Sequence, residues 1–293
     1  MNSKYNLKND ILFKAFFGKQ GNERFLKSFL EELLEIKIDK IEIITEYTLE
    51  QLAKEEKGGR LDLEAKINNE IIVNIELQIR NQKDIEKRTL YYAARLITEN
   101  SKAGEQYERL KQIIMINILD YELLEFKEYI SDTVTVINKH REYETIKNQK
   151  FYYIELPKFR KAKIDINDKL NQWIALIDDD KEMVEMAITK NKTIKEAKEE
   201  VDKLTADPNL RGILKLRDKW ERDYYNDIGC AKDEGREEGE RIGRNEGEKI
   251  GREEEKQEAA IAMFKLEMDM NNIMKVTKLT KKELEKIKKK YNL

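Results

Sequence analysis

The sequence predicts a mixed α/β core followed by a helical C-terminal part, and three observations support this prediction. Two neighbouring stretches, 60–67 and 71–78, alternate apolar and polar residues with period two, as half-buried strands do. Residues 112–119 form a nearly continuous apolar run, which is typical of a strand buried on both faces. From Asp168 onward the apolar residues recur with helical spacing.

The elements expected in chain order begin with two helices. Asn9 or Asp10 can cap the first helix, which Gly18 closes, and the second spans 22–34. Strands are expected at 38–47, 60–67, 71–78, 112–119, 134–137 and 151–156, and helices at 82–102, 170–177, 183–188, 193–204 and 210–225. We therefore predict four regions: an α/β core (1–165), a helical extension (166–228), a charged helical connector (229–255) and a small basic helical unit (256–293).

The two alternating stretches predict a hairpin with an acidic face. Their eight regular apolar positions are odd-numbered, so a loop of residues 68–70 would place all of them on one side, with Ile72 the one apolar misfit on the other. This register sets Asp62 opposite Glu76, with Cβ atoms about 4.5–5.5 Å apart, and Gln78 on the same face. Two carboxylates this close repel each other unless a cation lies between them, which predicts a metal site. The alternative is a solvated polar face with ordinary ion pairs.

Composition limits the kind of site. The chain has 293 residues with 57 basic against 59 acidic, so any DNA contact needs a local basic patch. A single cysteine, Cys230, and a single histidine, His140, exclude an internal disulfide and the cysteine- or histidine-ligated zinc sites. A bound metal would have oxygen ligands, which favours Mg²⁺ or Mn²⁺. Without a long apolar segment or a secretory signal, we expect a soluble cytoplasmic protein with no membrane contact.

Glycine recurs every four residues from Gly235 to Gly251, among Glu and Arg. On a helix these glycines would form one slowly drifting stripe, and each would cost about 1 kcal/mol relative to Ala. The stripe could let two helices approach closely, or the segment could be a charged, semi-ordered connector of low complexity. We favour the connector.

Residues 256–293 carry ten Lys against five acidic residues. Thr280 followed by Glu283 has the spacing of a helix capping box. Such short basic helices could touch phosphate groups, or they could be the solvated face of a segment through which two copies of the chain associate.

The order helix, three strands, helix, strand, with Asp62 on one hairpin strand and Glu76 and Gln78 on the next, resembles the PD-(D/E)XK nuclease superfamily. Within it, the chain is similar to the recombination-promoting nuclease (Rpn) family, also described as transposases. The similar stretches are 9–18, 61–63, 74–78, 87–92, 104–107, 113–119, the glycine-containing segment and 279–283. The resemblance implies a restriction-endonuclease-like αβββαβ core with a helical C-terminal extension.

The resemblance also implies roles for the acidic face. Asp62 and Glu76 match the metal-binding acids of the superfamily. Gln78 stands where many members have Lys; it keeps a hydrogen-bond donor but lacks the positive charge, and this leaves the general base unassigned. Glu64 shares the face and could bind a second ion or orient a water molecule.

Other residues match the family outside the hairpin. Arg88 and Tyr91 occupy helix positions that the family tends to fill with Arg and Tyr, and Arg88 could contact a phosphate. Packing and surface ion pairing would explain them equally well. Lys14 and Asp10 lie in the N-terminal signature, where Asp10 is more simply explained as a helix cap.

The activity implied is Mg²⁺-dependent hydrolysis of double-stranded DNA, with Mn²⁺ able to substitute, in recombination or transposition. The rival interpretation is a catalytically inactive DNA-binding or oligomeric protein that retains the nuclease fold. A third treats the C-terminal helical segment as a dimerisation module that brings two active sites to one duplex.

Overall fold

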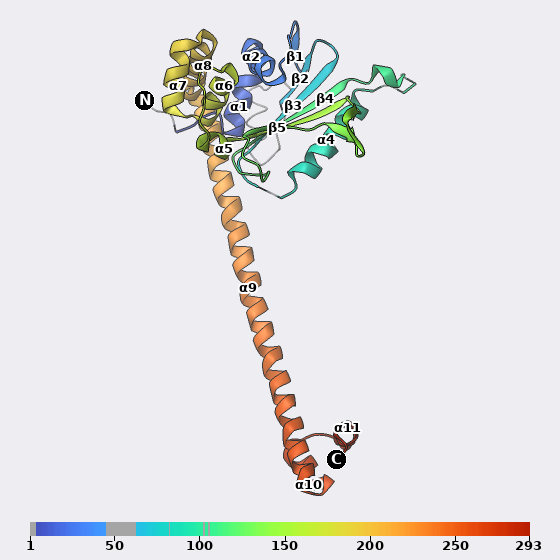
Figure 1. Ribbon diagram of the computed structural model, residues 1–293. Coiled ribbons are helices and arrows are strands. Elements are labelled where there is room, and N and C mark those ends of the chain that lie inside the picture. The colour runs from blue at the N-terminus through green and yellow to red at the C-terminus, as the bar shows by residue number, and fades with distance from the viewer. Residues whose placement is uncertain (1–3, 45–62, 82, 102, 105) are drawn as a thin grey trace. The chain divides into compact units, whose positions relative to one another are not determined.

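The computed structural model describes residues 4–44, 63–81, 83–101, 103–104 and 106–293. It confirms the predicted mixed α/β core with C-terminal helices (Figure 1). The 49–59 connector and Asp62 lie outside the described residues.

The predicted helices and strands occur in the expected order, together with several elements that were not predicted. The helices are α1 (Asp10–Phe17), α2 (Glu23–Leu34), α4 (Ile85–Glu99), the 3-10 helix η2 (Tyr107–Arg109), α5 (Leu156–Lys161), α6 (Lys169–Asp178), α7 (Lys181–Lys190), α8 (Lys192–Ala206), α9 (Pro208–Lys265), α10 (Met270–Thr277) and α11 (Lys281–Tyr291). The strands are β1 (Ile41–Ile43), β2 (Leu63–Ile67), β3 (Ile71–Gln78), β4 (Gln112–Leu119), β5 (Ile130–Asp132), β6 (Thr135–Ile137), β7 (His140–Thr145) and β8 (Gln149–Glu155).

Within the described part of the chain, six strands form one sheet in the order β1-β2-β3-β4-β8-β5. Strands β3, β4 and β8 are parallel, so their carboxyl ends lie at one edge of the sheet. Strand β2 pairs with β3 in the predicted register, with Leu63 opposite Ile75 and Glu64 opposite Asn74. The connecting turn uses Asn68 and Asn69 at φ values of 51° and 62°, a left-handed conformation that Asn tolerates better than most residues.

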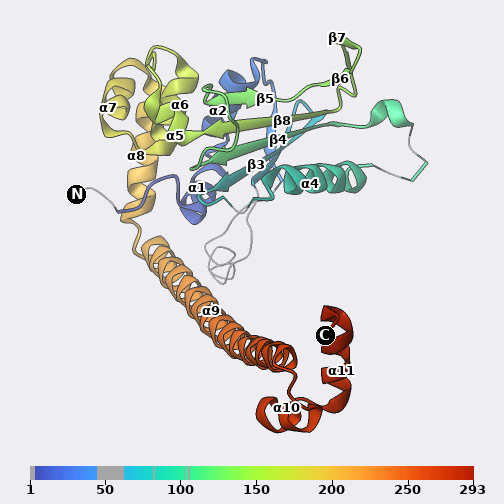
Figure 2. The ribbon, with the colours of Figure 1, turned by 60° about the horizontal axis from the view of Figure 1, so that its bottom comes forward.

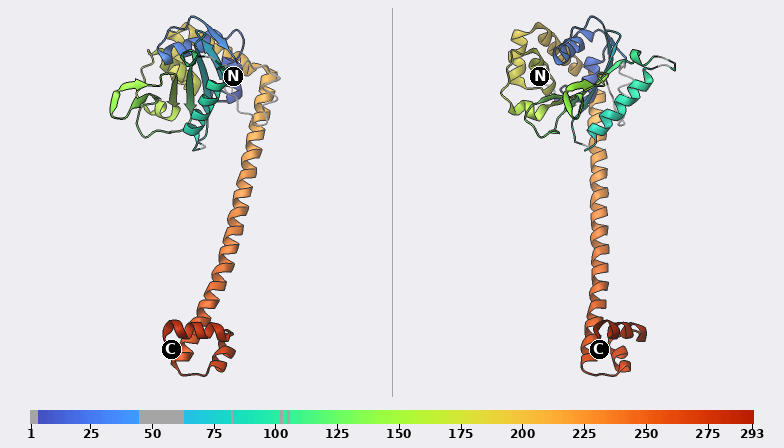
Figure 3. Two further views of the ribbon diagram at one scale, coloured as in Figure 1. Left: turned by 90° about the vertical axis from the view of Figure 1, so that its right-hand side faces the viewer. Right: turned by 45° about the vertical axis from the view of Figure 1, so that its right-hand side comes forward.

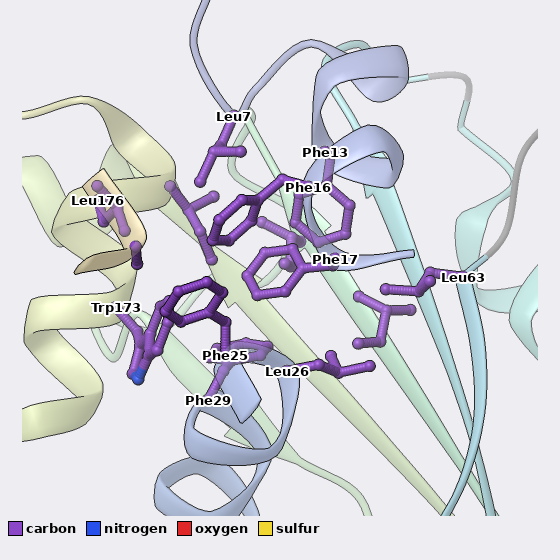
Figure 4. Packing of buried hydrophobic residues seen from close by; sticks show 14 of the residues in the cluster. Leu7, Phe13, Phe16, Phe17, Phe25, Leu26, Phe29, Leu63, Trp173 and Leu176 are labelled. Carbon is purple, nitrogen blue, oxygen red and sulfur yellow. The ribbon is translucent and has the colours of Figure 1, made fainter. Parts of the chain in front are cut away.

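The odd-numbered residues of the hairpin point into the main hydrophobic core. Helices α1 and α2 cover this face of the sheet and α6 packs beside them (Figure 1). Trp173 of α6 is fully buried among aromatic rings, with ring centroids 6.0 Å from Phe17 and 6.3 Å from Phe29 (Figure 4). The predicted boundary at residue 165 therefore falls between parts of the chain that share one core.

Helix α4 covers the other face of the sheet and runs along β3 and β4 (Figure 2). Ile72, the apolar misfit on the polar side of the hairpin, packs there with Ala93 and Leu96 of α4. Helix α4 thus covers part of the polar face of the hairpin. This covering explains why the apolar Ile72 is found on that face.

Several details differ from the sequence prediction. Asn9, and not Asp10, caps α1, because the Asn9 side chain accepts a hydrogen bond from the Leu12 amide. Strands β5 and β7 and helix α5 were not predicted. Strand β7 is almost wholly exposed and pairs with β6 outside the main sheet. Helix α9 continues through the glycine-containing segment without a break.

The chain divides into two compact units, residues 1–220 and 221–293, and α9 passes from one into the other. The predicted boundaries at residues 228 and 255 both fall within α9. None of the helices in the described residues is long and apolar enough to cross a membrane.

Candidate functional site

A row of three polar side chains lies on the face of β3 that α4 covers. Asn74, Glu76 and Gln78 alternate along the strand with the core residues, so all three point to the same side. Counted over the whole residue, Asn74, Glu76 and Gln78 are only 2%, 4% and 8% exposed. Burying a carboxylate in this way is unfavourable unless hydrogen bonds or a cation compensate its charge.

Glu76 is compensated at one of its two carboxylate oxygens. Its Oε1 accepts a hydrogen bond from Nε2 of Gln78 at 3.0 Å and forms an ion pair with the guanidinium of Arg88 from α4. Its Oε2 is buried and has no hydrogen-bond donor among the residues that the structure describes. One oxygen of this buried carboxylate is thus available to a further positively charged or hydrogen-bonding group.

Gln78 is oriented from both ends of its amide. Its Nε2 donates to Glu76, and its Oε1 lies 3.3 Å from the hydroxyl of Tyr121, which donates to it. Burial raises the pKa of Tyr121 to about 12, while the nearby Arg88 acts in the opposite direction. The hydroxyl therefore stays protonated, and a donor, over the physiological pH range.

The loop that carries Tyr121 is fastened to the neighbouring strand by a buried carboxylate. Glu155 at the end of β8 is fully buried, and its Oε2 accepts hydrogen bonds from the amides of Leu123 at 2.6 Å and Leu124 at 3.3 Å. Lys158 donates to the other oxygen at 2.7 Å. These bonds fix the chain just after Tyr121.

Asn117 lies next to Glu76 on the parallel strand β4 and is completely buried. Its Oδ1 lies 3.0 Å from the hydroxyl of Thr89 on α4, and its Nδ2 donates to the carbonyl of Tyr152 at 3.2 Å. Asn117, Thr89 and Tyr121 were not among the predicted site residues. A signal for Asn117 was present, because it is the one polar residue of the run 113–119.

The structure brings three of the predicted site residues together: Glu76, Gln78 and Arg88. Glu64 lies on β2 opposite Asn74 and is half-buried. Asp62 lies outside the described residues.

Three further residues were predicted: Tyr91, Asp10 and Lys14. Tyr91 is 66% exposed, and its ring packs against Tyr92 on the surface of α4. Asp10 accepts a hydrogen bond from Arg217 of α9 at 2.9 Å, which ties the N-terminal helix to the helical extension. Lys14 is buried on α1, whose apolar residues pack against the other face of the sheet.

The described oxygens suit a hard divalent cation. Oε2 of Glu76 and Oδ1 of Asn74 are both buried without a hydrogen-bond partner among the described residues, and both are the kind of donor that Mg²⁺ and Mn²⁺ prefer. No cluster of three or more Asp, Glu, His or Cys side chains able to hold a metal occurs within the described ranges.

Comparison with known proteins identifies one family. The family described as PD-(D/E)XK nuclease family transposase matches residues 7–231, which is more than half of the chain. No curated protein and no solved structure gives a significant match.

Proposed function

This chain belongs to the PD-(D/E)XK nuclease family transposases, and we propose that it is a metal-dependent DNA endonuclease whose cutting of double-stranded DNA serves recombination or transposition. The observation that carries the proposal is the buried Glu76, with one oxygen compensated by the protein and the other open among the described residues. Assignment to the narrower Rpn branch is part of the same proposal.

Asp62 and Glu76 are proposed to hold Mg²⁺, for which Mn²⁺ can substitute. The observed register of β2 and β3 supports this assignment, because it is the same register that was predicted from the sequence and that sets Asp62 opposite Glu76. The ion, when bound, would polarise the scissile phosphate and lower the pKa of a water molecule. Glu64, on the polar side of β2, would orient that water or assist with a second ion.

Gln78 and Arg88 are proposed to fill together the role of the Lys that many members of the superfamily have in place of Gln78. Gln78 cannot supply a positive charge, but its oriented amide can donate a hydrogen bond to a water or a phosphate oxygen. Arg88 supplies the positive charge from α4 and pairs with Glu76. We therefore assign Arg88 primarily as the counter-ion of Glu76; contact with a phosphate would require it to leave this pair.

The test is a paired nuclease assay on supercoiled plasmid DNA with and without Mg²⁺. We expect the wild-type protein to nick or linearise the plasmid, and Asp62→Ala to lower the rate at least a hundred-fold while circular dichroism shows an unchanged fold. Glu70→Ala is the matched control, since Glu70 is an exposed acid in the turn of the same hairpin. Equal cleavage by Asp62→Ala, or cleavage that survives excess EDTA, would overturn the proposal.

A catalytically inactive DNA-binding protein is the second candidate function. Two observations favour it: Gln78 stands where many members of the superfamily have Lys, and Arg88 forms an ion pair with Glu76. Calorimetric titration with Mn²⁺ separates the two. Glu76→Gln weakens Mn²⁺ binding if the site is functional, and leaves the titration unchanged if the site is vestigial.

A further inference from the structure

The last part of the chain is a small three-helix unit with its own core. The end of α9 packs with α10 and α11 around five buried residues (Figure 3). These residues are Ala260, Ile273, Leu279, Leu284 and Ile287. We refer to residues 256–293 as the C-terminal unit.

Helices α10 and α11 are joined by a turn of only three residues, 278–280. Lys278 ends α10 in the left-handed conformation with φ of 62°, and Leu279 is 6% exposed and belongs to the core. Thr280 begins α11 with a complete capping box in which Glu283 donates its backbone amide and accepts with its side chain. Two short helices, a three-residue turn and a supporting third helix together form a helix-turn-helix arrangement.

Positive charge is concentrated on this unit. Residues 270–293 contain eight Lys and two Glu, a net charge of +6, although the chain as a whole carries −2. Residues 1–269 therefore carry −8. The segregation of charge onto two short helices predicts a polyanionic partner for this part of the chain.

Three lysines of α11 lie on the side that faces away from the core. Lys282, Lys286 and Lys289 follow the spacing i, i+4, i+7, and all three are exposed. Leu284 and Ile287 occupy the opposite side and are buried. The exposed face of α11 thus presents a row of three basic side chains, with the exposed Glu285 beside them.

We propose that the C-terminal unit is a second DNA-binding site, with α11 laid against duplex DNA and Lys282, Lys286 and Lys289 contacting its phosphates. The major groove of B-form DNA is wide enough to admit an α-helix, whereas that of A-form RNA is deep and narrow. Self-association through this face would bring like charges together, which argues against a second copy of the chain as the occupant. The inference goes beyond the proposed nuclease centre and does not depend on it.

The test measures binding of the full-length protein to a fluorescent 20-base-pair duplex in EDTA, so that cleavage plays no part. Each phosphate contact contributes about 0.9 to the slope of log K against log salt concentration. We expect Lys282→Gln, Lys286→Gln and Lys289→Gln combined to weaken binding at least ten-fold at low salt and to reduce the slope by about 2–3. The three substitutions lie on exposed positions, so circular dichroism should report an unchanged fold.

The matched control removes the same charge from exposed lysines of the helical extension, Lys181→Gln, Lys195→Gln and Lys215→Gln. It should keep the affinity and slope of the wild-type protein. Unchanged affinity in the α11 variant would overturn the inference, as would equal losses in both variants or tighter binding to an RNA duplex of the same sequence. A change of molar mass in light scattering without a change in DNA affinity would assign the face to self-association instead. Failure of plasmid cleavage by the wild-type protein would leave this binding result intact.

Discussion

Arg88→Met tests how the candidate site compensates its buried charge. The side chains of Arg88 and Glu76 are 9% and 6% exposed, so Met removes the guanidinium from a buried pair while keeping much of the apolar side chain. Removing one partner of a buried ion pair costs about 3–5 kcal/mol, because the remaining charge is left uncompensated. In a unit of this size, 1 kcal/mol corresponds to about 2–4 °C, so Tm in EDTA should fall by about 6–20 °C.

Thermal unfolding in EDTA and in Mn²⁺, followed by circular dichroism, measures the effect. A cation held by Glu76 replaces the lost guanidinium, so Mn²⁺ should raise Tm more in Arg88→Met than in the wild-type protein. A ligand present at a hundred times its Kd contributes about 2.7 kcal/mol, enough to recover about half of the loss or more.

Arg95→Met is the control on the same helix. Arg88 and Arg95 both lie over the ring of Tyr92, but Arg95 is 44% exposed and pairs with the exposed Glu99. An exposed pair of this kind contributes at most about 0.5 kcal/mol, so Tm should change by no more than about 2 °C. If Arg88→Met unfolds at the wild-type Tm in EDTA, or if Mn²⁺ stabilises both proteins equally, the assignment of Arg88 as the counter-ion of Glu76 is refuted.

Three further predictions concern single residues. Lys278→Gly should stabilise the C-terminal unit by about 0.5–1 kcal/mol, because φ of 62° suits Gly better than Lys; a lower free energy of unfolding in urea would contradict this. Thr280→Ala should cost about 1 kcal/mol through loss of the capping box, measured in the same urea series, with an unchanged value counting against the cap. Burial raises the pKa of Tyr121 to about 12, above its ordinary value of 10. The stabilising effect of the protonated Tyr121 hydroxyl is therefore complete below pH 10 and is lost as the pH rises through 12. Tyr121→Phe should therefore lose less stability than the wild-type protein between pH 10 and 12, and an identical loss would disprove the link.

The register of the acidic hairpin was predictable from sequence because two local constraints agree. Period-two alternation fixed which residues share a face, and the three-residue connection containing Asn68 and Asn69 fixed the pairing. The structure confirms the predicted partners from Leu63 to Ile67. Glu76 and Gln78 could be named as site residues for the same reason.

The contacts made across the sheet could not be predicted in this way. Arg88 reaches Glu76, and Thr89 reaches Asn117, only because α4 lies on that face, and no local pattern says which face a crossover helix will cover. The apolar Ile72 on the polar side of the hairpin was the one sign in the sequence that a helix covers this face, and the alternation alone did not explain it.

Exposed elements were missed for the opposite reason. Strand β7 has almost no buried side chain, so its sequence carries no alternation to detect. In the glycine-containing segment, local propensity favoured a semi-ordered connector, whereas the structure has one continuous helix. Within the described part of the chain, a Cβ at each of these glycines would meet nothing within 4 Å, and the connector role itself stays a prediction.

Glu155 has an effect that reaches beyond its own position. It touches none of the side chains assigned to hydrolysis, yet its bonds to Leu123 and Leu124 hold the backbone from which Tyr121 steadies Gln78. A natural variant at Glu155 would therefore misalign the Gln78 amide and, under the proposed function, lower turnover while Glu76 and Arg88 kept their own contacts. If only turnover were measured, such a variant would be mistaken for the loss of a catalytic residue, although the change affects the hydrogen bonds that hold a loop in place.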